Sequence, residues 1–329
     1  MNTATQPMTS NPGAQRLKLE ALRAWEQLEY GMFIHFGMST FDGVELSKGD
    51  QPSTLYAPDQ LDVDQWIQVA RDAGMRYAVL TAKHVAGHCL WPTRLNDYHV
   101  GTSGNTTDVV EAFVRACEKH GVMPGLYYCS LDKHNVFGYD ERCLPNAKYV
   151  EFQLAQVEEL LTQYGKIGEV WIDIPPCLDW RDRRRQYDQI ARLQPQAIIM
   201  MNHGFGDGGK LDVSKVWPTD LMAIERWLPS SHRGYERWHK IPQLPQIGQE
   251  SLNYYIPGEV CDPIGYEWFY MEGDKPRSDA ELLGMRLICK ERHTNLLLDV
   301  PPDKHGVIPD MHIQSLKRLR KNYERTMVE

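Results

Sequence analysis

The sequence has no stretch of about 18 consecutive apolar residues, so no segment of the chain is expected to cross a membrane as a helix. Its seven cysteines are an odd number and include no Cys-x-x-Cys pair, which argues against a disulfide framework and against a zinc finger. Residues 1–15 lack the apolar core of a signal peptide, and a cytoplasmic location is therefore expected.

The chain also has no excess of basic residues, because 36 Lys and Arg stand against 44 Asp and Glu and give a net charge of -8. A nucleic-acid-binding protein needs a basic face for the phosphate backbone, so no nucleic-acid partner is expected. A neutral ligand such as a sugar fits this charge, and the 9 Trp and 16 Tyr supply flat faces on which sugar rings can stack. The sequence leaves open whether the chain forms a homo-oligomer.

Short apolar runs alternate with amphipathic stretches after a polar segment, 1–15, that predicts a flexible tail. This alternation is typical of βα units and a parallel sheet. Eight runs predict strands, at 32–36, 77–82, 123–129, 169–173, 197–201, 220–224, 258–260 and 295–298. Helices are predicted at 63–73, 107–120, 149–164 and 311–323. Residues 16–329 are therefore expected to form a single α/β domain, an irregular (β/α)8-like barrel. An open doubly wound sheet is the alternative, but no Gly-rich phosphate loop supports it.

Polar side chains follow six of the predicted strands. Because the chemistry of a parallel barrel gathers at the carboxyl ends of its strands, these positions are the candidates for a site. They are His35, Lys83 with His84, Tyr127 with Tyr128, Asp173, Asn202 with His203, and Glu225.

Two carboxylates stand out among these residues. Asp173 lies between a buried run and a Pro-Pro turn, and Glu225 ends another strand. Such a pair suits glycoside cleavage, in which one carboxylate attacks the anomeric carbon and the other protonates the leaving oxygen. Structural roles remain open for both: Asp173 could cap its own turn, and Glu225 could pair with Arg226.

The histidines do not form a recognised metal motif. His84 and His88 are four residues apart, but the strand pattern ends at His84, so helical ligand spacing does not apply. Neither His-x-His nor His-Glu-x-x-His occurs. No metal or organic cofactor is therefore expected. A metal-dependent barrel hydrolase using His35, His84 and Asp173 remains an alternative, and so does an inactive carbohydrate-binding barrel.

Five segments resemble the α-L-fucosidases of glycoside hydrolase family 29. They are YGMFIHFGMSTFDGVE, YAVLTAKHVAGHCLW, TTDVVEAFVRACEKHGVMPGLYYCS, EVWID and TNLLLDVPPDKHGVIP, which occur in the family's order over residues 25–310. The resemblance implies an irregular barrel that hydrolyses terminal α-L-fucosyl residues through a covalent intermediate, with retention of configuration. Members often carry a β-sandwich after the barrel, and none is expected here because the chain ends soon after its last barrel strand.

The resemblance also implies roles for individual residues. Asp173 matches the nucleophile, and Glu225 is similar to the acid/base, with Glu259 as its rival. His35 and His84 match histidines that hold fucose hydroxyls. The remaining predicted substrate contacts are Glu45, His88, Trp91, Tyr128, Trp171 and His203.

This chain departs from the family pattern at several of these motifs. Val85 and Ala86 stand where members have a second sugar-binding His and an Asp, and Leu46 follows Glu45 in place of Trp. Ile174 follows the nucleophile in place of Gly. His88 is a candidate to replace the lost His. A related 6-deoxy or galacto-configured sugar is accordingly the alternative to fucose.

Overall fold

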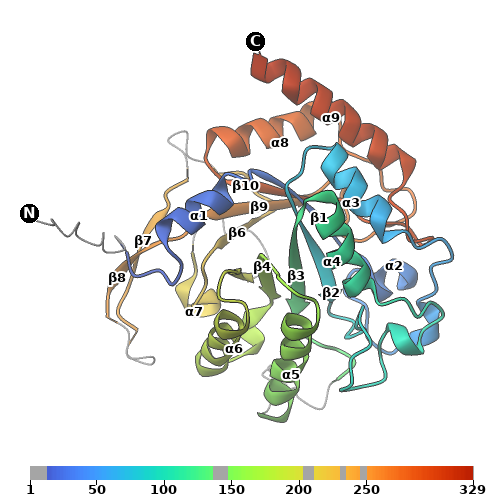
Figure 1. The fold of residues 1–329 in the computed structure, drawn as a ribbon, viewed down its shortest axis with the longest axis horizontal. Coiled ribbons are helices and arrows are strands. Elements are labelled where there is room, and N and C mark those ends of the chain that lie inside the picture. Colours follow the sequence, from blue (N-terminus) through green and yellow to red (C-terminus); the bar gives the residue numbers. More distant parts are fainter. Residues whose placement is uncertain (1–12, 136–146, 203–210, 230–234, 245–249, 329) are drawn as a thin grey trace, which may run out of the picture.

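A parallel sheet of eight strands forms the centre of the fold in a computed structural model, which describes residues 13–135, 147–202, 211–229, 235–244 and 250–328 (Figure 1). The order of strands in this sheet is β5-β4-β3-β2-β1-β10-β9-β6. The sheet strands are β1 (Tyr30–Ile34), β2 (Tyr77–Lys83), β3 (Met123–Cys129), β4 (Glu169–Asp173), β5 (Ile198–Asn202), β6 (Met222–Glu225), β9 (Gly258–Pro263) and β10 (Asn295–Asp299). The prediction of eight parallel barrel strands is confirmed.

The two ends of the sheet, β5 and β6, meet at a seam that nearly closes the barrel. Among the described residues the seam has a single isolated parallel bridge, between Met200 and Leu221, in place of a full ladder. The amide of Asp220 adds a hydrogen bond to the Ile199 carbonyl, at 2.8 Å. A separate antiparallel hairpin of β7 (Trp238–Ile241) and β8 (Leu252–Tyr255) follows β6 and was not predicted.

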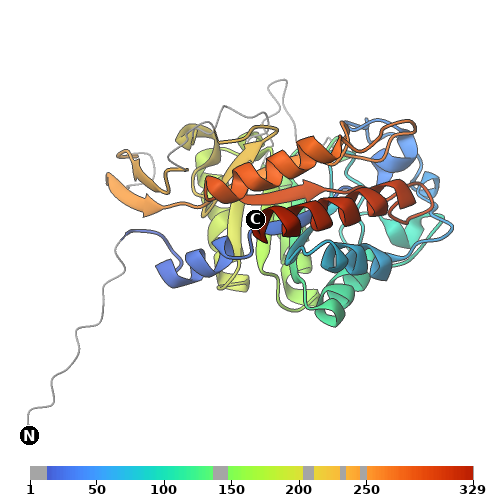
Figure 2. The same ribbon diagram turned by 90° about the horizontal axis from the view of Figure 1, so that it is seen from above.

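Helices surround the barrel, and α8 and α9 pack side by side in both views (Figure 2). The described helices are α1 (Leu19–Glu26), α2 (Met38–Asp42), α3 (Val63–Asp72), α4 (Val109–His120), α5 (Ala147–Gln163), α6 (Trp180–Leu193), α7 (Val213–Val216), α8 (Asp279–Glu291) and α9 (Asp310–Val328). Helix α4 illustrates how capping residues define the helix ends. The Asp108 carboxylate accepts the Glu111 amide at its start, and Gly121 ends it in the left-handed conformation. No helix in the described part of the chain is long and apolar enough to span a membrane.

Of the predicted tail, residues 1–15, the structure describes only residues 13–15, and residues 1–12 lie outside the described part of the chain. The Ala14 amide donates to the Asn253 carbonyl at 2.9 Å, and Gln15 is buried against Tyr255. The start of the described chain is therefore fixed to β8.

Side chains inside the barrel form layers, because alternate residues of each strand point inward. The layer at the amino ends of the strands contains Glu169 of β4 and Glu259 of β9, both fully buried. The next layer is largely aromatic and apolar and includes Phe33, Trp171 and Leu297. The layer at the carboxyl ends is polar and carries the candidate site.

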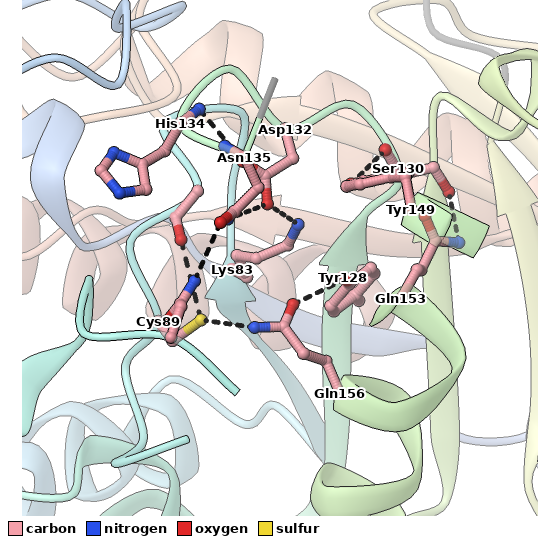
Figure 3. Close-up of polar contacts among 12 residues, drawn as sticks. Lys83, Cys89, Tyr128, Ser130, Asp132, His134, Asn135, Tyr149, Gln153 and Gln156 are labelled. Atoms are coloured by element: carbon pink, nitrogen blue, oxygen red, sulfur yellow. Dashed lines mark hydrogen bonds and ion pairs between the residues drawn. The ribbon is translucent and has the colours of Figure 1, made fainter. Parts of the chain in front are cut away.

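A buried ion pair lies between the sheet and α5, on the outer side of β2 and β3 (Figure 3). The Lys83 ammonium is 2.8 Å from an Asp132 oxygen, and both side chains are fully buried. The Asp132 carboxylate also accepts the amides of His134 and Asn135. This pair therefore joins the end of β2, which carries His84, to the loop that follows β3.

Replacing Lys83 by methionine is expected to lower the free energy of unfolding by about 3–5 kcal/mol, because Asp132 would stay buried without its countercharge. Chemical denaturation of the variant and the wild type measures this difference. The double variant Lys83→Met/Asp132→Asn is the matched control and should recover part of the loss, since the side-chain oxygen of the introduced asparagine can still accept the loop amides. Wild-type stability in the single variant would contradict the prediction.

Candidate active site

Asp173 ends β4 with its carboxylate held by three donors. The Tyr127 hydroxyl donates to Oδ2 at 2.5 Å, and the Asn202 side-chain amide donates to Oδ1 at 2.8 Å. The backbone N–H of Ile174 is the third donor. Burial and the nearby charge of Glu225 nevertheless raise the pKa of Asp173 to about 7, against the opposing effect of these hydrogen bonds.

Glu225 ends β6, across the barrel seam from Asn202. The same Asn202 nitrogen that donates to Asp173 also donates to Glu225 Oε2, at 3.0 Å. The two carboxylate oxygens can be no further apart than the sum of these distances, about 5.8 Å, and retaining glycosidases place their carboxyl groups about 5–5.5 Å apart. The structure thus brings together the two acids singled out in the sequence.

The residue after each carboxylate adopts a left-handed backbone conformation. Ile174 has φ 49° and Arg226 has φ 54°. This region is unfavourable for a β-branched residue and easy for glycine. Ile174 forms this turn with a side chain that packs against the barrel interior. Strain of this kind concentrates at functional sites.

His35 and His84 lie beside one another in a cluster of aromatic rings above β1 and β2. Their ring centres are 5.8 Å apart, and Phe269 packs edge-on against both, at 5.2 Å and 4.9 Å. The His35 Nδ1 atom is 2.8 Å from a carboxylate oxygen of Asp299. Burial lowers the pKa of His35 to about 3, so its ring is neutral at pH 7. Burial also lowers the pKa of His84, whose Nδ1 atom has no hydrogen-bond partner among the described residues.

Glu45 lies on the loop that follows α2, and the charges of Arg226 and Glu225 act on its carboxyl group. Burial raises the pKa of its carboxyl group, while the positive charge of Arg226 lowers it and Glu225 raises it. The Glu45 carboxyl group is thus within the range of the charges of Arg226 and Glu225 at the end of β6.

Three predicted substrate contacts lie apart from the residues around Asp173. Tyr128 lies on the outer side of β3, where its hydroxyl donates to Gln156 at 2.8 Å and Lys83 sits over its ring (Figure 3). Trp91 is fully buried and donates to Glu159. His88 packs against Tyr56 and bonds to Ser103 at 2.8 Å, so it does not replace the His lost at Val85.

Glu259, the predicted rival acid/base, also lies apart from Asp173. Its carboxylate accepts the Tyr77 hydroxyl at 2.6 Å and the Trp171 indole N–H at 3.0 Å, in the buried layer at the amino ends of the strands. Trp171 lies between this layer and the site. It packs against Phe33 and Tyr127 and so forms part of the layer on which the site residues rest. Burial raises the pKa of both Glu259 and its neighbour Glu169, as expected for carboxyl groups that share this interior.

Val85 is completely buried in the same apolar cluster as Tyr127 and Trp171. An apolar side chain therefore stands at the position of the second family histidine. Ala86, at the position of the family Asp, is buried as well.

His203 lies outside the described residues, so its predicted contact stays a prediction. The structure adds Trp268, Phe269 and Asp299 to the site, three residues that the sequence did not select. Tyr127 and Asn202 were strand-end candidates without an assigned role, and both donate to Asp173. No group of three or more His, Cys, Asp or Glu side chains in the described residues is arranged to hold a metal ion.

Comparisons with known proteins find sequences and structures that are similar to this chain. The family model described as Alpha-L-fucosidase matches residues 48–324. Alpha-L-fucosidase 1 of Arabidopsis thaliana is 32% identical over 94% of this chain and 60% of its own length. The crystal structure of a glycoside hydrolase 29 family member from a rumen bacterium is 26% identical, with a TM-score of 0.74, over 92% of this chain and 56% of that chain.

The structure of the α-L-fucosidase AlfC from Lactobacillus casei in complex with α-L-fucose shares the fold, with a TM-score of 0.75 and 21% identity over 94% of this chain and the whole of that one. By contrast, the chain spans only about three fifths of the length of the Arabidopsis relative. Because the family model covers most of the chain and the Arabidopsis relative is 32% identical over 94% of it, the chain belongs to the α-L-fucosidase family.

Proposed function

We propose that this chain is a retaining exo-glycosidase that removes terminal α-L-fucosyl residues, with Asp173 as nucleophile and Glu225 as acid/base. The observation that carries the proposal is the short separation of the two carboxylates, which one Asn202 nitrogen joins. The upper limit of about 5.8 Å for their nearest oxygens lies closer to the retaining spacing of about 5–5.5 Å than to the 6.5–9.5 Å of an inverting pair.

In the first step, an ionised Asp173 oxygen attacks the anomeric carbon and forms an ester bond. The bond from that carbon to the leaving oxygen breaks, and Glu225 gives its proton to the leaving oxygen. Tyr127 and Asn202 hold Asp173 in the direction of attack through hydrogen bonds to its two oxygens. They also favour the ionised form that the attack requires.

In the second step, water attacks the anomeric carbon of the ester while Glu225 takes one of its protons. The ester bond breaks, Asp173 leaves as the carboxylate, and fucose departs with its original configuration. His35 and His84 are neutral hydrogen-bonding groups beside the reacting pair and suit sugar hydroxyls, which donate as well as accept.

Proton NMR of a fresh reaction with an aryl α-L-fucoside tests the proposal. The first sugar released is expected to be the α anomer, before mutarotation mixes the two forms. Release of the β anomer would refute the double displacement. Binding of fucose without any turnover would instead favour the inactive carbohydrate-binding barrel that Val85 and Ala86 leave as the second candidate.

A further inference from the structure

The first residues that the structure describes lie against the amino end of the barrel seam. The backbone of Ala14 and the side chain of Gln15 hold this segment to β8. Arg16 then extends its side chain to the chain on both sides of the seam, just before β5 and just before β6. Arg16 is therefore placed to hold together the two strands whose far ends carry Asn202 and Glu225.

The guanidinium of Arg16 bonds to several groups at once. On the β5 side it donates to the carbonyls of Pro195 and Ala197, at 3.0 Å and 2.6 Å. On the β6 side it forms an ion pair with Asp220, whose side chain is buried. Because a guanidinium carries five N–H donors in a rigid plane, one arginine can span this set of acceptors, and a lysine cannot reproduce the geometry.

Asp220 extends this connection, because its carboxylate also bonds across the seam. One oxygen accepts the Ile199 amide of β5 at 3.0 Å, and the other accepts the Tyr187 hydroxyl of α6 at 2.5 Å. Burial raises the pKa of Asp220, and the positive charge of Arg16 opposes this effect. Arg16 therefore favours the ionised carboxylate, which is the stronger hydrogen-bond acceptor.

The seam depends on these side chains because it has no full ladder. On their other sides, β5 and β6 are paired along their length with β4 and β9. Across the seam, the described residues form one isolated bridge, Met200–Leu221, and the Thr219 hydroxyl accepts the Met201 amide at 3.1 Å. The angle between β5 and β6 is therefore set by side chains to a greater extent than the angles between the other neighbouring strands.

We propose that Arg16 is a positioning residue for the reaction: by fixing the amino end of the seam, it sets how far Glu225 stands from Asp173. This inference rests on the proposed function, in which the two acids act together. Asp220 precedes β6 and Glu225 ends it, so about 17 Å of extended chain separates Arg16 and its partner from the reacting groups. A tilt of β6 at its amino end would move Glu225 away from the nucleophile and the two histidines, which stand on other strands.

The test measures how kcat/KM depends on the leaving group, at a temperature well below the unfolding midpoint of each variant. Arg16→Met is expected to lower kcat/KM about tenfold for phenyl α-L-fucoside, whose leaving oxygen needs the proton of Glu225. For the dinitrophenyl fucoside, which departs without protonation, the loss should be no more than about twofold. Arg16→Lys should recover part of the loss, because it keeps the charge beside Asp220. Arg184→Met is the matched control and should change neither value, since Arg184 pairs with Asp188 on the exposed face of α6.

The double variant Arg16→Met/Asp220→Asn separates positioning from stability. It removes the buried carboxylate together with its countercharge, so chemical denaturation should show a more stable fold than that of Arg16→Met. The steeper dependence on the leaving group should nevertheless remain, because the bonds from Arg16 to the β5 carbonyls are still missing. If Arg16→Met alone does not fold, the double variant carries the test.

Equal losses of kcat/KM on both fucosides in a folded variant, or a loss on neither, would overturn the positioning role of Arg16, because proton transfer from Glu225 would then not be selectively affected. A dependence on the leaving group that returns to the wild-type value in the double variant would overturn it as well. A wild-type chain that turns over neither fucoside would instead refute the proposed function, which separates the two failures.

Discussion

Replacing Asp173 by glycine is expected to lower kcat for an aryl α-L-fucoside by a factor on the order of 10⁴ or more. The carboxylate that would form the ester is then missing, and the donors around it, Tyr127 and Asn202, are left facing an empty space. Steady-state release of the aryl alcohol at pH 7 by the variant and the wild type measures the loss. Activity close to that of the wild type would remove Asp173 from the mechanism.

Azide provides the positive control for this variant. It fits the space left by the carboxylate and can attack the anomeric carbon directly, so the rate should recover and the product should be β-L-fucosyl azide. The inverted product identifies the face from which Asp173 normally attacks.

The pH dependence of the free energy of unfolding provides a second control for Asp173. The folded-state pKa of Asp173 is about 7 and its usual value is 3.8, so the folded protein holds the proton more tightly than the unfolded chain. Ionised Asp173 therefore opposes folding, and this cost grows as the pH rises from about 4 to about 7. Asp173→Asn should be at least as stable as the wild type at pH 8, with an advantage that disappears near pH 4.

Replacing Glu225 by glutamine is expected to lower kcat/KM about 10²–10⁴-fold for a fucosyl disaccharide, whose leaving oxygen needs a proton. A dinitrophenyl fucoside should lose much less in the first step, because its leaving group departs without protonation. The dependence of rate on the leaving group, measured over a series of aryl fucosides, should accordingly become steeper in the variant.

The same variant should shift the pH profile. Burial is the main cause of the raised pKa of Asp173, and the negative charge of Glu225 adds to it. Glutamine removes that charge, so the acidic limb of kcat/KM for the dinitrophenyl substrate should move to lower pH. Glu259→Gln is the matched control, since Glu259 lies in the far layer of the barrel and bonds to Tyr77 and Trp171. A leaving-group dependence that changes in this control and not in Glu225→Gln would reverse the assignment of the acid.

The eight strands could be predicted because most of them are short, almost fully buried runs between turn residues, a pattern that is visible in the sequence. Helix α6 could not, because its residues are largely charged and only a narrow face, including Tyr187 and Ile190, is buried. Where such a helix packs is decided by tertiary contacts rather than by a visible apolar period.

Some residues of the candidate site could likewise be predicted from the sequence, and others could not. Strand ends point to Asp173, Glu225 and the two histidines, since position alone brings strand ends together. The choice between Tyr127 and Tyr128 needs the register of β3, because a shift of one residue changes the face of the sheet. Trp268 and Phe269 come from a loop with no strand signal, and only the folded chain brings them to His35.

The two acids lie on opposite sides of the seam between β5 and β6. Asp173 and Asn202 stand on one side of this seam, Glu225 stands on the other, and the Asn202 side-chain amide spans the gap. The closure of the barrel at this seam therefore also sets the distance between the proposed nucleophile and the proposed proton donor. We therefore expect that loosening this seam, by heat, denaturant or a distant substitution, changes the spacing of the two carboxylates.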